Sequence, residues 1–220
     1  MIGDFLEYRK SDNIHSELIK SVIITENIQD NPDESIKINW QELKSINKDN
    51  IAWIRIKNTH IDYPILRSQE PLEYLNRSFN GEYNKNGSIF TINVNPFIDK
   101  ITTIYGHNMK SGLMFTDISK YMNKDFFREH SVFEIYTESM NYKATVFSVY
   151  SIGERTEENN IKSLSFEDEI QYYKSKSVYP VENINGIEKI VKLSTCSYIN
   201  NKAIPTDQRY FLIAKLEILE

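Results

Sequence analysis

The single cysteine of the chain, Cys196, stands where a thiol could do chemistry. It ends an alternating run in which Val191, Leu193 and Thr195 share one face of an expected strand. If that face is the core, Cys196 lies on the outer face, where a substrate could reach it. The thiolate form of cysteine is a strong nucleophile. The structural alternative is a small buried hydrophobic residue, which is what most lone cysteines are.

An arginine is expected beside this cysteine. A second strand should begin at Arg209, after a loop over residues 199–208 that contains the chain-breaking residues Pro205 and Asp207. If the two strands pair antiparallel, Cys196 and Arg209 stand near each other at the loop end, on the same outer face. A thiol beside a guanidinium is a reactive-site arrangement that needs an acid or a base. The alternative for Arg209 is a solvated charge at a strand end.

The candidate for the acid or base is His107. It follows an expected strand over residues 101–105 and stands in Tyr-Gly-His-Asn, where Gly106 allows the backbone to turn and present the ring. A structural role is expected for the other histidines, which are His15, His60 and His130.

The pattern of the chain predicts a β-barrel that carries these residues. From Ile51 onward, short segments rich in β-branched and aromatic residues alternate with turn residues, and helices occur only in the connections. We therefore expect a mainly β protein, with a closed or nearly closed barrel of seven to eight strands. The expected strands are 51–57, 63–67, 87–92, 101–105, 132–137, 142–152, the run ending at 196, and the run beginning at 209.

Helices are expected before the barrel and within its connections, where apolar residues recur at helical spacing. Asn39 is a plausible cap for a short helix, and Ser165 with Asp168 three residues later resembles the start of another. We divide the chain into an N-terminal helical segment, residues 1–48, that packs on a barrel domain, residues 49–220. The expected helical segments are 4–29, 39–46, a single turn at 71–76, 111–131 and 165–173.

Composition excludes several classes of function. A net charge of −5 and a pI near 5.5 argue against a nucleic-acid partner. One cysteine excludes an internal disulfide and a zinc site built from several cysteines, and we expect no metal or cofactor. No apolar run approaches the roughly 20 residues that span a bilayer, and no secretory signal opens the chain.

Three stretches together resemble the sortases. They are Tyr-Gly-His-Asn around His107, Leu-Ser-Thr-Cys ending in Cys196, which matches the family's TLxTC, and Arg209 at the start of the final strand. The N-terminal helices and the helix inserted between the sixth and seventh strands are similar to class B of the family. One departure is Lys192, where the family usually has threonine; alternation turns this side chain outward, so no effect on the chemistry is expected.

The resemblance implies a sortase-like barrel and a membrane-anchored cysteine transpeptidase on the outer face of the cytoplasmic membrane of Gram-positive cells. Such enzymes cleave the C-terminal sorting signal of a surface protein after its threonine and join the new carboxyl to a peptidoglycan or lipid-linked precursor amine. Class B members prefer Asn-Pro-Gln-Thr-like or related Pro-x-Thr signals. Because sortases of this class carry an N-terminal membrane anchor that is absent from this chain, we expect a soluble ectodomain.

The resemblance also assigns roles to residues. Cys196 is implied as the nucleophile, Arg209 as a donor to the oxyanion, and His107 as the acid that protonates the leaving amine and the base that activates the incoming one. A groove for the sorting signal is expected to be lined by Ser194, Thr195 and Tyr198.

Two other functions remain open at this stage. A cysteine peptidase with the same three residues would use water in place of the amine. A non-catalytic surface or adhesion barrel would use Cys196 structurally, and its thiol would alkylate slowly.

Overall fold

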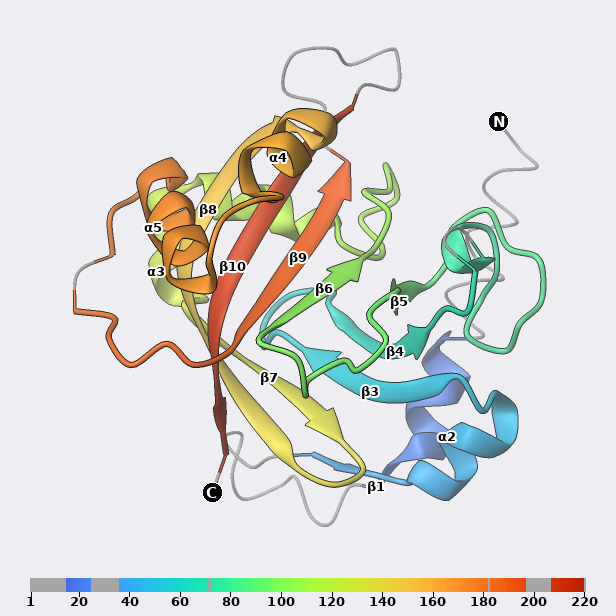
Figure 1. The fold of residues 1–220 in the computed structure, drawn as a ribbon. Helices are drawn as coiled ribbons and strands as arrows, with labels where there is room; N and C mark the ends of the chain where they lie inside the picture. The colour runs from blue at the N-terminus through green and yellow to red at the C-terminus, as the bar shows by residue number, and fades with distance from the viewer. Residues whose placement is uncertain (1–14, 25–35, 71–72, 182, 197–206, 220) are drawn as a thin grey trace.

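The computed structural model describes residues 15–24, 36–70, 73–181, 183–196 and 207–219. At its centre is a closed barrel with the strand order β10-β8-β7-β3-β4-β5-β6-β9 (Figure 1). The expected closed barrel of seven to eight strands is confirmed. The strands are β3 (Asn50–Arg55), β4 (Asp62–Arg67), β5 (Ile89–Thr91), β6 (Ile101–Tyr105), β7 (Val132–Thr137), β8 (Asn141–Gly153), β9 (Ile190–Cys196) and β10 (Gln208–Ile218).

The inner faces of the strands form the main hydrophobic core. Val191 and Leu193 of β9 pack there beside Leu212 of β10, and all three are fully buried. Burial of an aliphatic side chain contributes about 1.5–3 kcal/mol, so this face fixes which residues of each strand point outward. The alternation expected for β9 is therefore confirmed by its core face.

Two parallel pairs interrupt an otherwise antiparallel barrel. β4 pairs parallel with β5, and β6 pairs parallel with β9. β10 then pairs antiparallel with β9 on its other side. The C-terminal ends of β6 and β9 and the start of β10 therefore meet at one end of the barrel.

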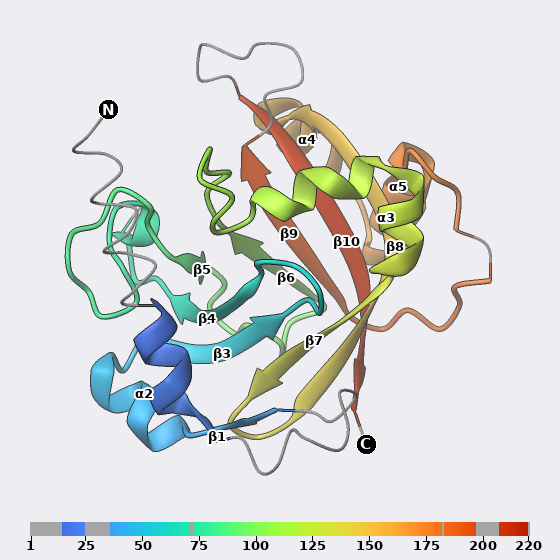
Figure 2. The ribbon, with the colours of Figure 1, turned by 180° about the vertical axis from the view of Figure 1, so that it is seen from behind.

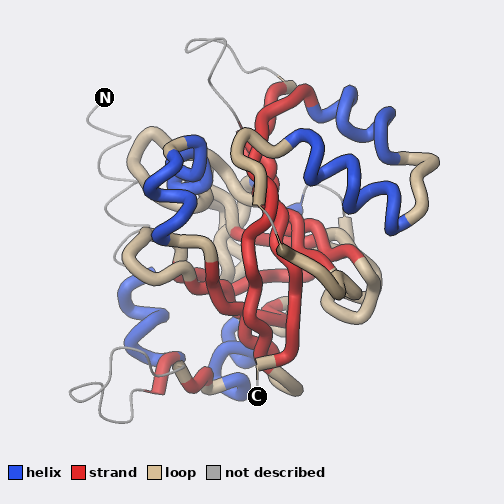
Figure 3. Tube along the Cα trace, turned by 90° about the vertical axis from the view of Figure 1, so that its left-hand side faces the viewer, coloured by secondary structure: helices blue, strands red, loops and turns tan. Residues whose placement is uncertain are grey.

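Two helices cover the outer face of β8, β9 and β10 (Figures 1 and 3). They are α4 (Glu154–Ile161) and α5 (Phe166–Lys176). The expected start of α5 is confirmed, because the Ser165 hydroxyl accepts a hydrogen bond from the Asp168 N–H at 3.1 Å. The helix α4 was not predicted, since its residues carry no apolar stripe and Glu157 is its buried residue.

The N-terminal segment covers a different part of the barrel. Residues 15–22 are helical, and α2 (Trp40–Ile46) follows the two-stranded pair of β1 (Ile23–Ile24) and β2 (Lys37–Ile38). Apolar residues of these elements form a cluster with Trp53 of β3 and Tyr136 of β7. Packing of this segment on the barrel follows, while the boundary at residue 48 stays a prediction.

One helix boundary in this segment was predicted wrongly. The helix expected over residues 4–29 ends by Ile23, because Ile23 and Ile24 pair with Ile38 and Lys37 instead. Both isoleucines are β-branched and suit a strand once a partner is present. The cap on α2 is confirmed: the Asn39 side chain accepts from the Glu42 N–H at 3.1 Å.

The connection after β6 is less helical than expected. Residues 111–115 form a bend in which Met114 has φ 57°, and the helical part is η2 (Thr116–Met122) followed by α3 (Lys124–Glu129). Ile118 and Tyr121 of η2 pack into the barrel core, so this segment crosses the barrel when it is seen from behind (Figure 2). A single 3-10 turn, η1 (Glu73–Leu75), stands where one helical turn was expected. None of the described helices is long and apolar enough to span a membrane.

Candidate active site

The pairing of β9 with β10 brings Cys196 and Arg209 together. Their Cα atoms are direct partners in the antiparallel ladder, at the end of β9 and the beginning of β10. The expected pairing is confirmed for the backbone, which is the part of Cys196 that the structure describes. Arg209 alternates with Tyr210 and Leu212 of the core and so shares the outer face with Phe211. The outward orientation of the thiol stays a prediction.

The parallel pairing of β6 with β9 brings His107 to the same end of the barrel. Tyr105 is the partner of Ser194, and the Gly106 N–H donates to the Ser194 carbonyl at 3.2 Å. His107 lies two residues beyond Tyr105, and Cys196 lies two residues beyond Ser194. Because parallel strands advance in the same direction, His107 and Cys196 both lie toward this end of the barrel, while direct contact between their side chains stays a prediction.

Gly106 is needed here for close packing. A Cβ atom at this position would lie 2.5 Å from Ile89 Cδ1 and 2.8 Å from Phe115 Cδ2, well inside van der Waals contact. The backbone of Gly106 does not have the positive φ that favours glycine. The prediction of a glycine that allows the backbone to turn was therefore wrong in its reason, because the constraint is space between β6, β5 and the following loop.

The ring of His107 is half-buried and oriented by a backbone carbonyl. Its Nε2 atom lies 2.8 Å from the Leu75 oxygen in η1. A carbonyl oxygen can only accept, so in this arrangement Nε2 carries the proton and donates it. The neutral ring then has Nδ1 as its proton acceptor. The turn at η1 thus selects one tautomer of the candidate acid–base group.

The guanidinium of Arg209 is held by a carboxylate that the sequence did not point to. Its Nη2 atom lies 2.9 Å from Glu154 Oε2, and its Nη1 donates to the Gln208 carbonyl at 3.1 Å. Glu154 is the first residue of α4. No periodic signal marks α4 in the sequence, so this contact could be found only once the helix was placed.

The residues expected to line a substrate groove are placed differently from one another. Ser194 and Thr195 are both buried, with 2% of each exposed. Thr195 shares the inner face with Leu193, and its hydroxyl oxygen is buried without a hydrogen-bond partner. Tyr198 lies outside the described residues. A role for these residues in substrate binding stays a prediction, and it is less direct for Thr195 because of the face on which it lies.

Tyr105 is a site neighbour that the motif analysis missed. It lies on the outer face of β6, and its ring stacks on Phe90 of β5 with centroids 5.7 Å apart. Burial, together with the charge of Glu154, raises the pKa of its hydroxyl. The alternation of β6 was the available signal, because it places Tyr105 outward and beside Ser194.

Lys192 points outward as expected, yet it is buried. The side chain lies beneath α4 and α5, where Nζ is 2.6 Å from Glu157 Oε1 and lies over the rings of Tyr173 and Phe211. Desolvation by burial lowers the pKa of Lys192, although the charge of Glu157 opposes this shift. The outer face of the barrel is thus shielded from solvent at this position. The lysine that replaces the family's threonine therefore forms a buried ion pair with Glu157.

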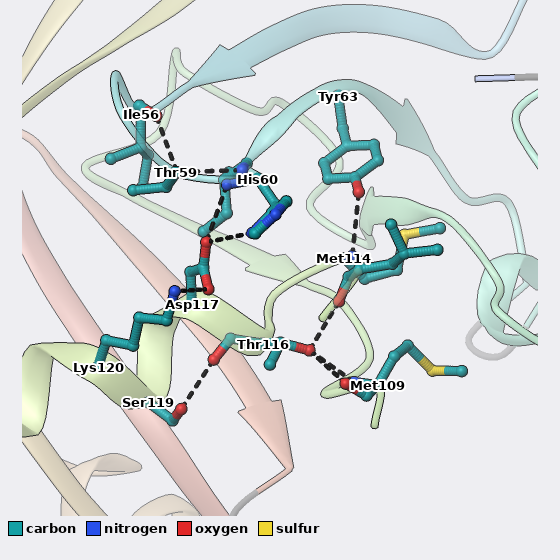
Figure 4. Close-up of polar contacts among 12 residues, drawn as sticks. Ile56, Thr59, His60, Tyr63, Met109, Met114, Thr116, Asp117, Ser119 and Lys120 are labelled. Atoms are coloured by element: carbon teal, nitrogen blue, oxygen red, sulfur yellow. Dashed lines mark hydrogen bonds and ion pairs between the residues drawn. The ribbon is translucent and has the colours of Figure 1, made fainter. Parts of the chain in front are cut away.

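The loop after His107 is held by hydrogen bonds from both sides (Figure 4). The Thr116 hydroxyl lies 2.8 Å from both the Met109 nitrogen and the Met109 oxygen. The Met114 N–H donates to the Tyr63 hydroxyl at 3.1 Å. At the start of the loop, the Phe115 N–H donates to the carbonyl of His107 itself at 2.9 Å. These contacts tie the backbone that carries His107 to the barrel.

A buried carboxylate connects η2 to the turn between β3 and β4. Asp117 accepts from the backbone N–H of His60 at 2.8 Å and contacts its ring Nδ1 at 3.0 Å, while Lys120 Nζ lies 2.8 Å away (Figure 4). Burial alone would raise the pKa of Asp117, but these hydrogen bonds and the Lys120 charge bring it below its ordinary value of 3.8. The contact gives His60 the structural role that was expected for it.

Comparison with known proteins identifies the family of the chain. The family model of the sortase domain matches residues 54–217, which is most of the chain. The chain belongs to the sortase family. Sortase B of Listeria monocytogenes is 36% identical over 195 residues, covering 84% of this chain and 79% of the relative. Sortase B of Staphylococcus aureus is 30% identical over 192 residues, covering 83% and 76%.

Solved structures place the chain in class B of the sortases. The X-ray structure of Clostridium perfringens sortase B has a TM-score of 0.72 and 30% sequence identity, covering 80% of this chain and 98% of that one. The structure of sortase B from Listeria monocytogenes has a TM-score of 0.67 and 36% identity, covering 80% and 98%. The resemblance seen in the three motifs is therefore confirmed, and membership supports a cell-wall transpeptidase role.

Proposed function

We propose that this sortase cleaves a C-terminal sorting signal of the Pro-x-Thr type after its threonine and transfers the new acyl group to a peptidoglycan amine through a thioester on Cys196. The observation that supports this is the convergence of three strand ends. Cys196 and Arg209 are Cα partners, and β6 delivers His107 to the same end of the barrel. A nucleophile, an acid–base group and a cation are the parts that such an acyl transfer requires.

In the first half of the reaction, the Cys196 thiolate attacks the carbonyl carbon of the threonine. The carbonyl electron pair moves onto oxygen, and Arg209 with nearby backbone N–H groups stabilises that oxyanion. Collapse of the tetrahedral intermediate breaks the peptide bond and leaves a thioester. His107 as imidazolium donates a proton to the departing amine, so the leaving group is neutral.

In the second half, an amine of the peptidoglycan or its lipid-linked precursor attacks the thioester. The now neutral His107 accepts a proton from that amine, and the thiolate of Cys196 leaves. A new amide bond joins the surface protein to the cell wall, and the enzyme returns to its starting charge state. We expect a bell-shaped dependence of rate on pH, with both limbs moved by substitution of His107.

The partners follow from the same proposal. The substrates are surface proteins with a C-terminal sorting signal, and the enzyme acts on the extracellular face of the cytoplasmic membrane, held by an N-terminal anchor. Ser194, Thr195 and Tyr198 are proposed to contribute to the groove for the signal. One structural neighbour, 28% identical, is a sortase B described as a complex with Gly3. That neighbour makes an amino-terminal glycine peptide a sensible first acceptor to test.

Intact-mass spectrometry tests the proposal. The protein is incubated with Asn-Pro-x-Thr-Asn and Pro-x-Thr-Gly peptides, with and without triglycine or diaminopimelate. An adduct on Cys196 that amine converts into a ligated peptide supports transpeptidation and identifies the signal. An adduct released only by water under every acceptor supports a hydrolytic peptidase instead. Absence of an adduct with every peptide, together with a slowly alkylated thiol, supports the non-catalytic barrel.

Substitution of Arg209 tests the oxyanion role. Loss of one such donor costs about 3 kcal/mol, or roughly a hundredfold in rate, so R209A should reduce thioester formation by at least that factor. R209K should also fail, because lysine lacks the planar fork of donors. The matched control is Arg155→Ala, which removes an exposed guanidinium from α4 and should retain wild-type rates. A fully active R209A variant would contradict the assigned role.

A further inference from the structure

The side chain of Arg209 is held partly from outside its own strand, by Glu154 of α4. The side chain has four rotatable bonds, and ordering such a chain costs up to about 2 kcal/mol. A donor stabilises an oxyanion only if it is already oriented when charge develops. Among the contacts that restrain the guanidinium are those with the Glu154 carboxylate at 2.9 Å and with the Gln208 carbonyl at 3.1 Å. Of these contacts, the one with Glu154 is an ion pair.

We propose that Glu154 is a positioning residue for Arg209, and that the buried pair of Lys192 and Glu157 holds α4 so that Glu154 reaches it. The inference rests on the proposed function, since it assigns a purpose to the orientation of Arg209. It connects a lysine of the nucleophile strand to the guanidinium of the next strand through one helix.

The first turn of α4 is fixed at its beginning by the backbone. The Glu154 N–H donates to the Asp207 carbonyl at 2.8 Å, which ties the helix to the residue preceding β10. Gly153 fits closely beside Asp207, since a Cβ there would lie 2.8 Å from the Asp207 carboxylate. The backbone of Glu154 is therefore placed next to the strand that carries Arg209.

Three residues after Glu154, the first turn of α4 is also fixed by a buried carboxylate, that of Glu157. Glu157 is 1% exposed and accepts three hydrogen bonds, from Lys192 Nζ at 2.6 Å, the Tyr150 hydroxyl at 2.6 Å and the Tyr172 hydroxyl at 2.9 Å. Residues three apart lie on the same side of a helix, so Glu157 and Glu154 face the barrel together. A rotation of α4 that moved Glu154 off Arg209 would break the contacts of Glu157.

The orientation of α4 depends on polar contacts, because the helix makes few apolar ones. Glu157 is the buried residue of α4, and Ile161 at its far end is only partly buried. The helix therefore has little apolar surface to hold it, and the Lys192–Glu157 pair sets its orientation. Lys192 is the position at which the chain departs from the threonine usual in TLxTC, so the departure supplies the cation of this anchor.

A different role for Glu154 makes the opposite prediction. If the carboxylate restrained Arg209 away from the substrate, its removal would raise the rate. If it orients Arg209, removal lowers kcat and leaves KM nearly unchanged, because the oxyanion forms only during reaction. The direction of the change in kcat thus separates the two roles.

The experiment measures kcat and KM for peptide cleavage by the wild-type protein, E154Q, E154A and the control E158A, after the wild type has been shown to form the Cys196 adduct. Glu158 is an exposed carboxylate on the same helix, so E158A controls for lost charge. We expect E154A to lower kcat about tenfold or more at constant KM, since a misplaced catalytic group can cost about a hundredfold. E154Q, which keeps an oxygen acceptor, should recover most of the rate.

Any of three results would overturn the inference while leaving the proposed function intact: wild-type or higher kcat in E154A, no rescue by E154Q, or an equal loss in E158A.

The role of the Lys192–Glu157 pair in holding α4 is tested separately with K192M, assayed well below its unfolding temperature. We expect K192M to lower kcat in the wild-type background but not in E154A, because Lys192 acts through Glu154. An equal loss of kcat in both backgrounds would show that Lys192 does not act through Glu154. A wild-type protein without an adduct would instead count against the proposed function.

Discussion

Two buried carboxylates flank the candidate active site, and they are neutralised in different ways. Glu157 lies under α4 on the Arg209 side, with its partner Lys192 also buried; their side chains are 2% and 6% exposed. Asp117 lies in η2 on the His107 side and is equally buried, but Lys120 is 51% exposed and His60 is 64% exposed. One site is a closed ion pair, and the other is a buried acid with partners in water.

This difference in the exposure of the partners predicts how much stability is lost when a partner of Glu157 or of Asp117 is substituted. Loss of a buried partner leaves a charge without solvent or counterion, whereas loss of an exposed partner lets water replace it. The backbone N–H of His60 would remain on Asp117 in any side-chain variant of Lys120. Substitution of the partner of Glu157 on the Arg209 side should therefore cost much stability. Substitution of a partner of Asp117 on the His107 side should cost little, whereas substitution of Asp117 itself should cost more.

The largest expected effect is that of Lys192→Met. It leaves Glu157 buried and uncompensated, which typically costs about 3–5 kcal/mol. Urea or thermal unfolding of the variant should show a loss in that range. The double variant K192M/E157Q should recover part of it, since a neutral glutamine needs no counterion and still accepts from Tyr150. Equal stability of the single and double variants would show that the pair is not coupled.

A smaller loss is expected for Asp117→Asn. Asparagine keeps an oxygen for the His60 N–H but loses the charge that strengthens three contacts. Hydrogen bonds to a charged group contribute about 1.5–3 kcal/mol, so equilibrium unfolding should show a loss of stability of about that size. Asp125→Asn, at an exposed position of α3, is the matched control and should be neutral. A neutral D117N would contradict the anchoring role.

The pH dependence of stability should reveal the same residue. The pKa of Asp117 is depressed in the folded state, so its stabilisation is fully present above 3.8 and is lost as pH falls through the folded-state pKa. The difference in unfolding free energy between wild type and D117N should therefore be constant from pH 7 to about 5 and shrink below pH 3.8. A difference that grows on acidification would reverse the sign of the argument.

The smallest effect is expected for Lys120→Ala. An exposed ion-pair partner contributes about 0.2–1 kcal/mol, and salt weakens it further. Side-by-side unfolding of K120A and K192M then tests the comparison itself. Both lysines form ion pairs of similar length, 2.8 Å for Lys120 and 2.6 Å for Lys192, so a similar cost would mean that burial does not decide the contribution of the pair to stability.

Much of the barrel could be predicted because its strands alternate. The bounds of β6 and β7 match the expected segments, and the others differ by few residues, since a one-residue slip would turn a hydrophobic face to solvent. The helix α4 could not be predicted in this way, as it presents Glu157 to the barrel where an apolar residue would give a periodic signal. Ile23 and Ile24 were missed for a related reason, because their partner strand lies elsewhere in the chain.

By itself the sequence determined the strand faces, the order of the His107, Cys196 and Arg209 motifs, and through them the sortase family. These depend on local alternation and on residue identity, both of which can be read directly from the sequence. Only the tertiary structure decided that the outward Lys192 is buried, that Glu154 reaches Arg209, and that Leu75 orients His107. Those contacts join segments far apart in the chain, and a side chain's environment is set by whichever element packs over it.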